Sequence, residues 1–265
     1  KNAGASQEDA DLIAQVVANA NEDFANQIIG EVTKNSTEEN QALSAKVMKS
    51  IVESNPDKID SLSDENKDNM ISQTIEAAKN QSEGNTNDDV DLTNTIAEII
   101  TKSNDETATK VLETLTDTLE ESESKLALNV VSNLTKQENY EEKMDSLSIT
   151  STKIDQNISK LVEKAVKNTS SEDDLKLVAD IIENTEGSIV DKIINSANKS
   201  EESKKKISEI IVKVVKENPE KAIEIIEKNK NTNVVLETIK TKIENNETVS
   251  TDDFEEVFDT DVSPN

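Results

Sequence analysis

Apolar residues recur in short stripes with helical spacing along the whole chain. The clearest stripe lies in the segment Ile207–Ile226, where five branched residues share one face of a helix: Ile207, Ile210, Ile211, Val214 and Val215. Asn218 and Pro219 predict the start of a second helix, because Asn is a favoured N-cap and Pro a favoured first helical residue. The short connection predicts an antiparallel helical hairpin.

Similar stripes predict further hairpins before and after this one. Asparagines mark the predicted turns, and 34 residues separate Asn21 from Asn55, 35 separate Asn104 from Asn139, and 34 separate Asn184 from Asn218. The gaps between these pairs are 49 and 45 residues, so extra helix or loop is expected there. A recurring period of this size indicates stacked hairpins. We therefore expect an all-α fold, an elongated solenoid of roughly seven to nine stacked antiparallel helical hairpins.

The pattern divides the chain into four segments. Residues 1–80 are predicted to form N-terminal helical hairpins, and 81–89 a polar loop or joint, because Asn80–Asp89 is the longest polar stretch. Residues 90–246 continue the array. Residues 247–265 depart from the pattern and form an acidic, aromatic-bearing tail or assembly arm.

Composition narrows the function classes. The chain of 265 residues is 33% hydrophobic and 2% aromatic, so its core must be thin and aliphatic. Its net charge is -27 and its basic residues are all lysines, which argues against nucleic-acid binding. Without His or Cys, and with isolated glycines, it lacks the usual residues of nucleophilic, zinc and phosphate-loop sites. We expect no enzyme, and no apolar run is long enough to span a membrane.

The C-terminal tail allows two interpretations. It carries eight acids between Glu244 and Asp261, and three apolar residues among them: Phe254, Val257 and Phe258. In the first interpretation it is a frayed, solubilising terminus. In the second it is an assembly arm that inserts its apolar residues into a neighbouring copy, while its acids meet the lysine-rich block upstream, which includes Lys204, Lys205, Lys206 and Lys213.

Calcium is the ion that the acids of this tail would suit, through Asp252, Asp253, Asp259 and Asp261. The stretch lacks the glycine and terminal glutamate of an EF-hand loop, so solvated acids are the alternative. No other cofactor is expected.

The period of the turns resembles that of tetratricopeptide and related α-solenoid repeats. The likeness lies in length and pattern only, since the chain has no Trp and no run matching the tetratricopeptide signature. The texture of LIAQVVANANEDFANQIIGEV also resembles repeat regions of large surface proteins of marine bacteria, which implies an extracellular or cell-surface location. The first residue, Lys1, predicts a fragment or a mature chain after cleavage.

Together these features favour a non-enzymatic structural subunit that assembles end to end with copies of itself into a filament or layer. The alternative is a monomeric solenoid scaffold that binds a protein or peptide, and a small-ligand pocket on a helix face comes third.

Overall fold

The computed structural model describes residues 6–82, 84, 91–119, 124–150, 152–167, 169, 171–184, 188–196, 201–228 and 235–254. Regular structure in these ranges is helical, with no strand, so the predicted all-α class is confirmed. The chain divides into two compact units, Lys1–Leu161 and Val162–Asn265.

The helices of the first unit are α1 (Gln7–Asn19), α2 (Glu22–Val32), α3 (Glu38–Ser54), α4 (Asp57–Asp60), α5 (Asp64–Ser82), α6 (Leu92–Lys102), α7 (Asp105–Thr118), α8 (Ser124–Thr135) and α9 (Tyr140–Thr150). Helix α10 (Thr152–Lys167) crosses the boundary between the units. The second unit contains α11 (Glu172–Asn184), α12 (Ser188–Asn195), α13 (Glu201–Glu217), α14 (Pro219–Lys228) and α15 (Val235–Glu244).

Local sequence sets several of these helix starts. Ser6 and Asp9 form a capping box at the start of α1, and Asn21 and Asn104 accept backbone hydrogen bonds as the N-caps of α2 and α7. Asn218 accepts a hydrogen bond from the Lys221 backbone, and α14 begins at Pro219. The turn chemistry predicted for these three asparagines is therefore confirmed.

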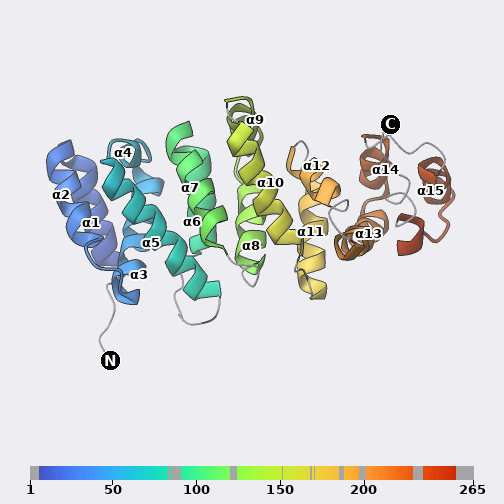
Figure 1. The fold of residues 1–265 in the computed structure, drawn as a ribbon, viewed down its shortest axis with the longest axis horizontal. Coiled ribbons are helices and arrows are strands. Elements are labelled where there is room, and N and C mark those ends of the chain that lie inside the picture. The colour runs from blue at the N-terminus through green and yellow to red at the C-terminus, as the bar shows by residue number, and fades with distance from the viewer. Residues whose placement is uncertain are drawn as a thin grey trace. The chain divides into compact units, whose positions relative to one another are not determined.

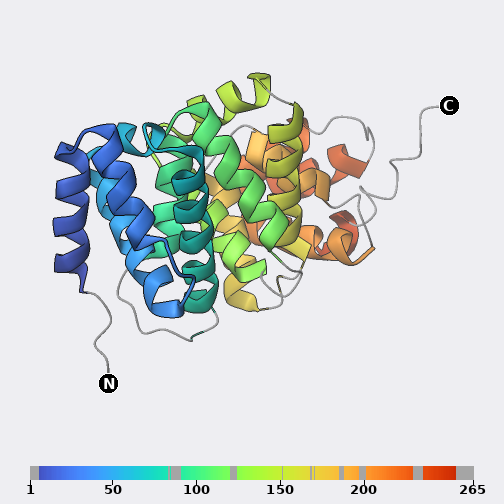
Figure 2. The same cartoon turned by 60° about the vertical axis from the view of Figure 1, so that its left-hand side comes forward.

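The first unit is a double layer of helices. Helices α1, α3, α6 and α8 contact one another in that order in one layer, while α2, α5 and α7 follow one another in the second. Neighbours along the chain, such as α1 and α2 or α6 and α7, pair across the layers as hairpins (Figures 1 and 2). Each hairpin therefore buries its apolar side chains against its own partner helix and against the adjacent hairpins.

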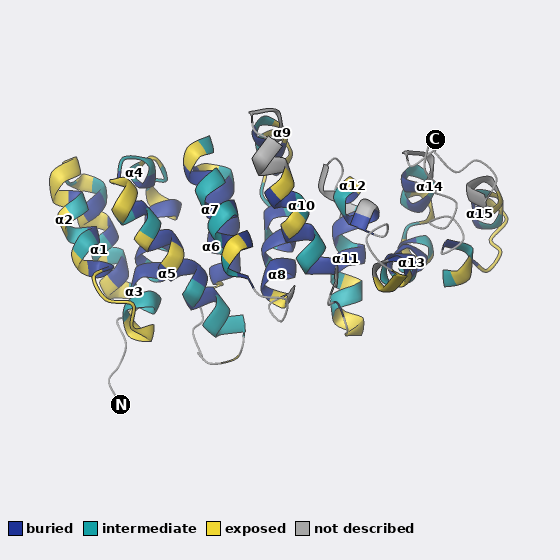
Figure 3. Cartoon of the chain, in the orientation of Figure 1, coloured by how far each residue is buried: buried dark blue, intermediate teal, exposed yellow. Residues whose placement is uncertain are grey.

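The core lies between the layers and is aliphatic (Figure 3). Its fully buried side chains include Ile51, Ile75, Ile96, Ile100 and Leu112. In the second unit the predicted stripe of α13 is also buried at Ile207, Ile210, Ile211 and Val214, and α13 packs on α11 and α14.

Polar contacts between consecutive hairpins join residues about 40 positions apart. Ser50 donates to Asp11 (2.6 Å, 39 residues apart), and Asn66 donates to the Asn26 carbonyl (2.9 Å, 40 residues apart). Lys58 donates to the backbone carbonyl of Ala20 at the end of α1 (2.7 Å, 38 residues apart). These separations match the average spacing of all the turn asparagines, about 39 residues, rather than the 34 or 35 residues within each pair.

The same pattern continues along the first unit. Lys143 repeats the role of Lys58, donating to the carbonyl of Ser103 at the end of α6 (2.8 Å) and to Asp105 (2.7 Å). A cation that reaches the last carbonyls of a helix is favoured both by hydrogen bonding and by the helix dipole. In these contacts the donor belongs to the later hairpin and the acceptor to the earlier one, whereas Gln7 donates to Ser50 in the reverse sense.

Two details differ from the sequence-based expectations. Helix α5 continues to Ser82, so the start of the polar stretch Asn80–Asp89 is helical rather than loop, and residues 85–90 lie outside the described part. The helical spacing of Leu12, Ile13, Val16 and Val17 predicts one buried apolar stripe, but Leu12 and Val16 are exposed, because Ala10, Ala14 and Val17 form the buried face of α1.

Asp60 is a testable link between hairpins. It accepts from the Asn104 backbone (3.0 Å) and from the hydroxyl of Thr107 (2.7 Å), a fully buried residue. Asp60→Ala removes both bonds, leaves the hydroxyl of buried Thr107 without its acceptor, and is expected to destabilise the first unit by about 1–3 kcal/mol.

Tyr140 is the single tyrosine of a chain without Trp, and it lies in the first unit, so its fluorescence during urea unfolding reports on that unit. Asp57→Ala is the control, since it removes the same charge from an exposed position of the same short helix and is expected to cost less than about 0.5 kcal/mol. Equal urea midpoints for the two variants would contradict the prediction.

Candidate functional site

The start of the predicted tail is folded against the second unit. Helix α15 ends at Glu244 in a Schellman motif, in which Glu247 donates to the carbonyl of Lys242 (2.8 Å) and Asn246 to that of Ile243 (3.0 Å). Asn246 has a positive φ of 56°, as this motif requires. After this turn Val249 is buried, and residues 251–254 form a further helical turn.

Phe254 is buried within its own chain, with 1% of its surface exposed. It therefore cannot insert into a neighbouring copy without first leaving its site. Val257 and Phe258, the other apolar residues of the predicted arm, lie outside the described residues.

The candidate calcium ligands are not brought together within the described part. Asp253 caps the last helical turn by accepting from Ser250 and also accepts from Lys242 (2.7 Å). Burial alone would raise the pKa of Asp253, but the hydrogen bonds from Lys242 and Ser250 outweigh burial and lower it. Asp252 is exposed, and Asp259 and Asp261 lie outside the described residues.

Three of the four predicted assembly lysines are engaged inside the second unit. Lys204 pairs with Glu201 (2.7 Å), Lys206 with Glu202 (3.4 Å), and Lys213 with Glu172 of α11. Lys205 is exposed. These three lysines are therefore committed to contacts within the chain.

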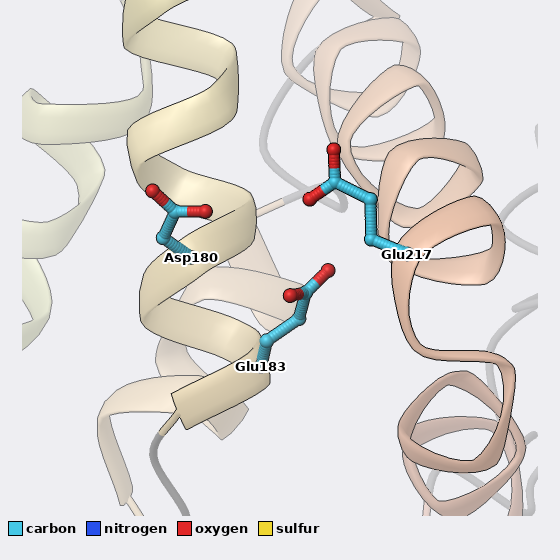
Figure 4. Close-up of side chains that lie close together, drawn as sticks. All are labelled: Asp180, Glu183 and Glu217. Atoms are coloured by element: carbon cyan, nitrogen blue, oxygen red, sulfur yellow. The ribbon is translucent and has the colours of Figure 1, made fainter.

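A cluster of three carboxylates lies between α11 and α13 of the second unit. Oxygens of Asp180, Glu183 and Glu217 all lie within 4.8 Å of one another, and the side chains converge from the two helices (Figure 4). One oxygen of Glu183 is buried and has no hydrogen-bond partner. Burial raises the pKa of Glu183, and the charges of Glu217 and Asp180 raise it further, while Lys176 opposes them.

The chemistry open to this cluster is limited. Carboxylate oxygens are ligands for hard cations, but Ca²⁺ takes six to eight of them. Mutual repulsion and burial already account for the raised pKa of Glu183. The cluster is therefore a place where close carboxylates repel one another. A catalytic role would require a nucleophile or substrate pocket beside it.

Sequence reasoning missed this cluster although the register contains the signal. Glu183 and Glu217 each stand directly before a turn asparagine, Asn184 and Asn218, so stacked hairpins place them at equivalent positions. Asp180 precedes Glu183 by three residues and shares its helix face. In a chain with 56 acids, the closeness of these three becomes apparent only when the two hairpins are aligned on their turn asparagines.

A second candidate surface lies on the first hairpin. Among the described residues, the large hydrophobic side chains that stand exposed are Leu12 (60%), Val16 (49%) and Phe24 (51%), all on α1 and α2. Exposed positions along these two helices are visible in Figure 3. Single exposed apolar residues are common, but three on one hairpin make it a candidate interaction surface.

The positions of these residues relative to the turn asparagine of their hairpin show which way their side chains face. Val16 stands five residues before its turn asparagine, as do Ser50 and Lys213, which contact the preceding hairpin through Asp11 and Glu172. Phe24 stands three residues after Asn21, and the equivalent Lys58 and Thr107 also reach the preceding hairpin. Leu12 lies one turn before Val16 on the same stripe. We call Leu12, Val16 and Phe24 the N-terminal face; later hairpins use the equivalent surface to pack on the hairpin before them.

Comparisons with protein-family models, with curated proteins and with solved structures found no match. None of the described helices is long and apolar enough to cross a membrane.

The carboxylate cluster predicts a pH-dependent stability. Because the pKa of Glu183 is raised, the folded state holds this proton more tightly than the unfolded state, so stability is lost as pH rises from the ordinary glutamate pKa, about 4.3, through the raised value. Glu183→Gln should therefore raise the melting temperature near neutral pH, by a margin that shrinks toward pH 4. Melts followed by circular dichroism between about pH 4 and 8 measure this.

The control is Glu209→Gln, which removes a half-buried charge from α13 outside the cluster. A gain for Glu183→Gln that is independent of pH, or matched by Glu209→Gln, would contradict the raised pKa of Glu183.

Two phenylalanines provide a matched test of burial. Phe254→Ala removes a fully buried ring and is expected to destabilise the second unit by about 3–5 kcal/mol. Phe24→Ala removes an exposed ring and should cost less than about 1 kcal/mol. Denaturant unfolding followed by circular dichroism compares them, and a harmless Phe254→Ala would support the frayed-terminus interpretation of the tail.

Proposed function

We propose that this chain is a non-enzymatic helical-repeat protein, built as a solenoid of hairpins, that binds another protein through its N-terminal face. The observation that supports this most is the exposure of Leu12, Val16 and Phe24 at positions where later hairpins stack on their neighbours. A surface shaped for stacking helices and left apolar is suited to receiving a helix from a partner.

Residue types support a binding role over catalysis. The chain has no His and no Cys. The cluster of acids in the second unit therefore has neither a cysteine nucleophile nor a histidine base beside it. An aromatic ring such as Phe24 is the type of anchor that carries binding energy in protein interfaces.

End-to-end self-assembly is the second candidate. The N-terminal face also favours self-assembly, because a surface of a solenoid that packs on a hairpin can pack on one from a second copy. Such head-to-tail contacts build filaments. The burial of Phe254 and the pairing of Lys204, Lys206 and Lys213 weaken the version in which the tail is the arm. Repulsion between chains of net charge -27 also opposes it.

Site-specific photo-crosslinking tests the binding role. A photo-reactive phenylalanine analogue placed at Phe24 should yield discrete protein adducts in cells of the native source, because a partner covers that side chain. The same analogue at Glu38, an exposed residue at the start of α3, is the control. Adducts equal in pattern and yield at both positions would refute a binding role for the face, and an adduct of two copies would favour self-assembly.

A further inference from the structure

We propose that the partner element bound by the N-terminal face is an amphipathic α-helix rich in lysine. This inference rests on the proposed function and specifies the chemistry of the ligand. It follows from the shape of the face, from its missing hydrogen-bond donors and from its charge.

The shape of the face favours a helix as the bound element. The positions of Val16 and Phe24 are those at which Ser50, Lys58 and Thr107 touch the helices of the hairpin before them. Each layer of the first unit continues by placing helix against helix, α1 on α3 and α2 on α5. The element that covers α1 and α2 from the other side therefore meets the same ridged surface, which an apolar helix face fits.

Hydrogen bonding argues against another hairpin of the same kind, including one from a second copy. At the internal contacts the later hairpin supplies donors, such as Lys58 and Lys143, to acceptors on the earlier hairpin. The first hairpin has Phe24 where Lys58 stands in the next one and Val16 where Ser50 stands. If another hairpin packed on the N-terminal face as hairpins pack inside the first unit, its acceptor groups would face Val16 and Phe24 instead of hydrogen-bond donors. Burying acceptors without a donor costs free energy.

Charge selects a basic partner. Residues 2–33 contain six acids and no lysine; the acids are Glu8, Asp9, Asp11, Glu22, Asp23 and Glu31. Glu8 is exposed and lies one turn before Leu12 on the same stripe. Exposed Glu31 lies two turns after Phe24 and pairs with Lys34 (3.1 Å) in an ion pair that is open to solvent. Because α1 and α2 are antiparallel, both carboxylates lie at the same end of the hairpin. Lysines suit this arrangement, since their aliphatic stems cover apolar surface while their ammonium groups reach the acids.

Three labelled peptides of about 18 residues, long enough for five helical turns, test the proposal against the full chain. The first has a leucine stripe flanked by lysines, the second has the same stripe flanked by glutamates, and the third has the lysines but glutamine in place of leucine. Fluorescence anisotropy measures their dissociation constants. The leucine–lysine peptide should bind most tightly, by at least about tenfold over each of the others.

Variants locate the bound peptide. Leu12→Ser/Val16→Ser/Phe24→Ser changes only exposed side chains, so the fold should persist, and it should weaken the leucine–lysine peptide at least about tenfold. Glu8→Gln/Glu31→Gln should weaken it severalfold and reduce its salt dependence. Glu38→Gln/Glu39→Gln, an equal change of charge at exposed positions of α3, should leave affinity unchanged.

The outcomes separate this inference from the proposed function. Equal affinity of the leucine–lysine peptide for the wild type and the triple serine variant would overturn the inference, because the peptide would then bind elsewhere on the acidic chain. If the glutamate peptide binds as well as the lysine peptide, or if the wild type oligomerises in light scattering and the serine variant does not, the face binds protein but the basic partner is wrong. If neither peptide binding nor association responds to the serine variant, the proposed function fails as well.

Discussion

The structure depends on helices that can bury their apolar faces only by lying against a neighbouring hairpin. With 2% aromatic residues, the core consists mainly of Ile, Val, Leu and Ala side chains, and each helix covers them by packing on its neighbours. Consecutive hairpins are therefore held edge to edge, and side chains about 40 residues apart meet repeatedly, as in Asn66 with Asn26 and Lys143 with Ser103. Apolar burial supplies most of the stability of such a stack, while the polar contacts fix its register.

These polar contacts give the stack a direction. When the later hairpin brings a lysine or amide and the earlier one offers a carbonyl or carboxylate, the two sides of a hairpin are chemically unlike. Lys58 and Lys143 each use the free carbonyls at the end of a helix, which attract a cation through the helix dipole. Each hairpin therefore fits between its neighbours in one orientation, with its donors toward the earlier hairpin and its acceptors toward the later one. The first hairpin breaks the rule on one side alone: Asp11 and Asn26 still offer acceptors to the next hairpin.

Local chemistry made much of the helical framework predictable. The stripe of α13, Asn218 as N-cap and Pro219 as first residue of α14 follow from spacing and capping, which act within a few residues. The exposure of Leu12 and Val16 could not be predicted in this way, because a stripe shows that a side chain is apolar and says nothing about whether another helix covers it. The carboxylate cluster of Glu183 and Glu217 required the alignment of two hairpins, and the folded tail required the left-handed turn at Asn246.

The distribution of phenylalanine bears on the proposal that a partner binds the first hairpin. A chain with three Phe residues and no Trp has few large side chains with which to fill its core, and burying a ring is worth several times the free energy of burying a methyl group. Phe254 is used in that way, fully enclosed beside the capped turn that contains Asp253. Phe24 is left half in water at a position where the next hairpin has a lysine. Folding gains little from an aromatic ring there, whereas an interface gains an anchor, so the residue suits a surface that a partner helix covers.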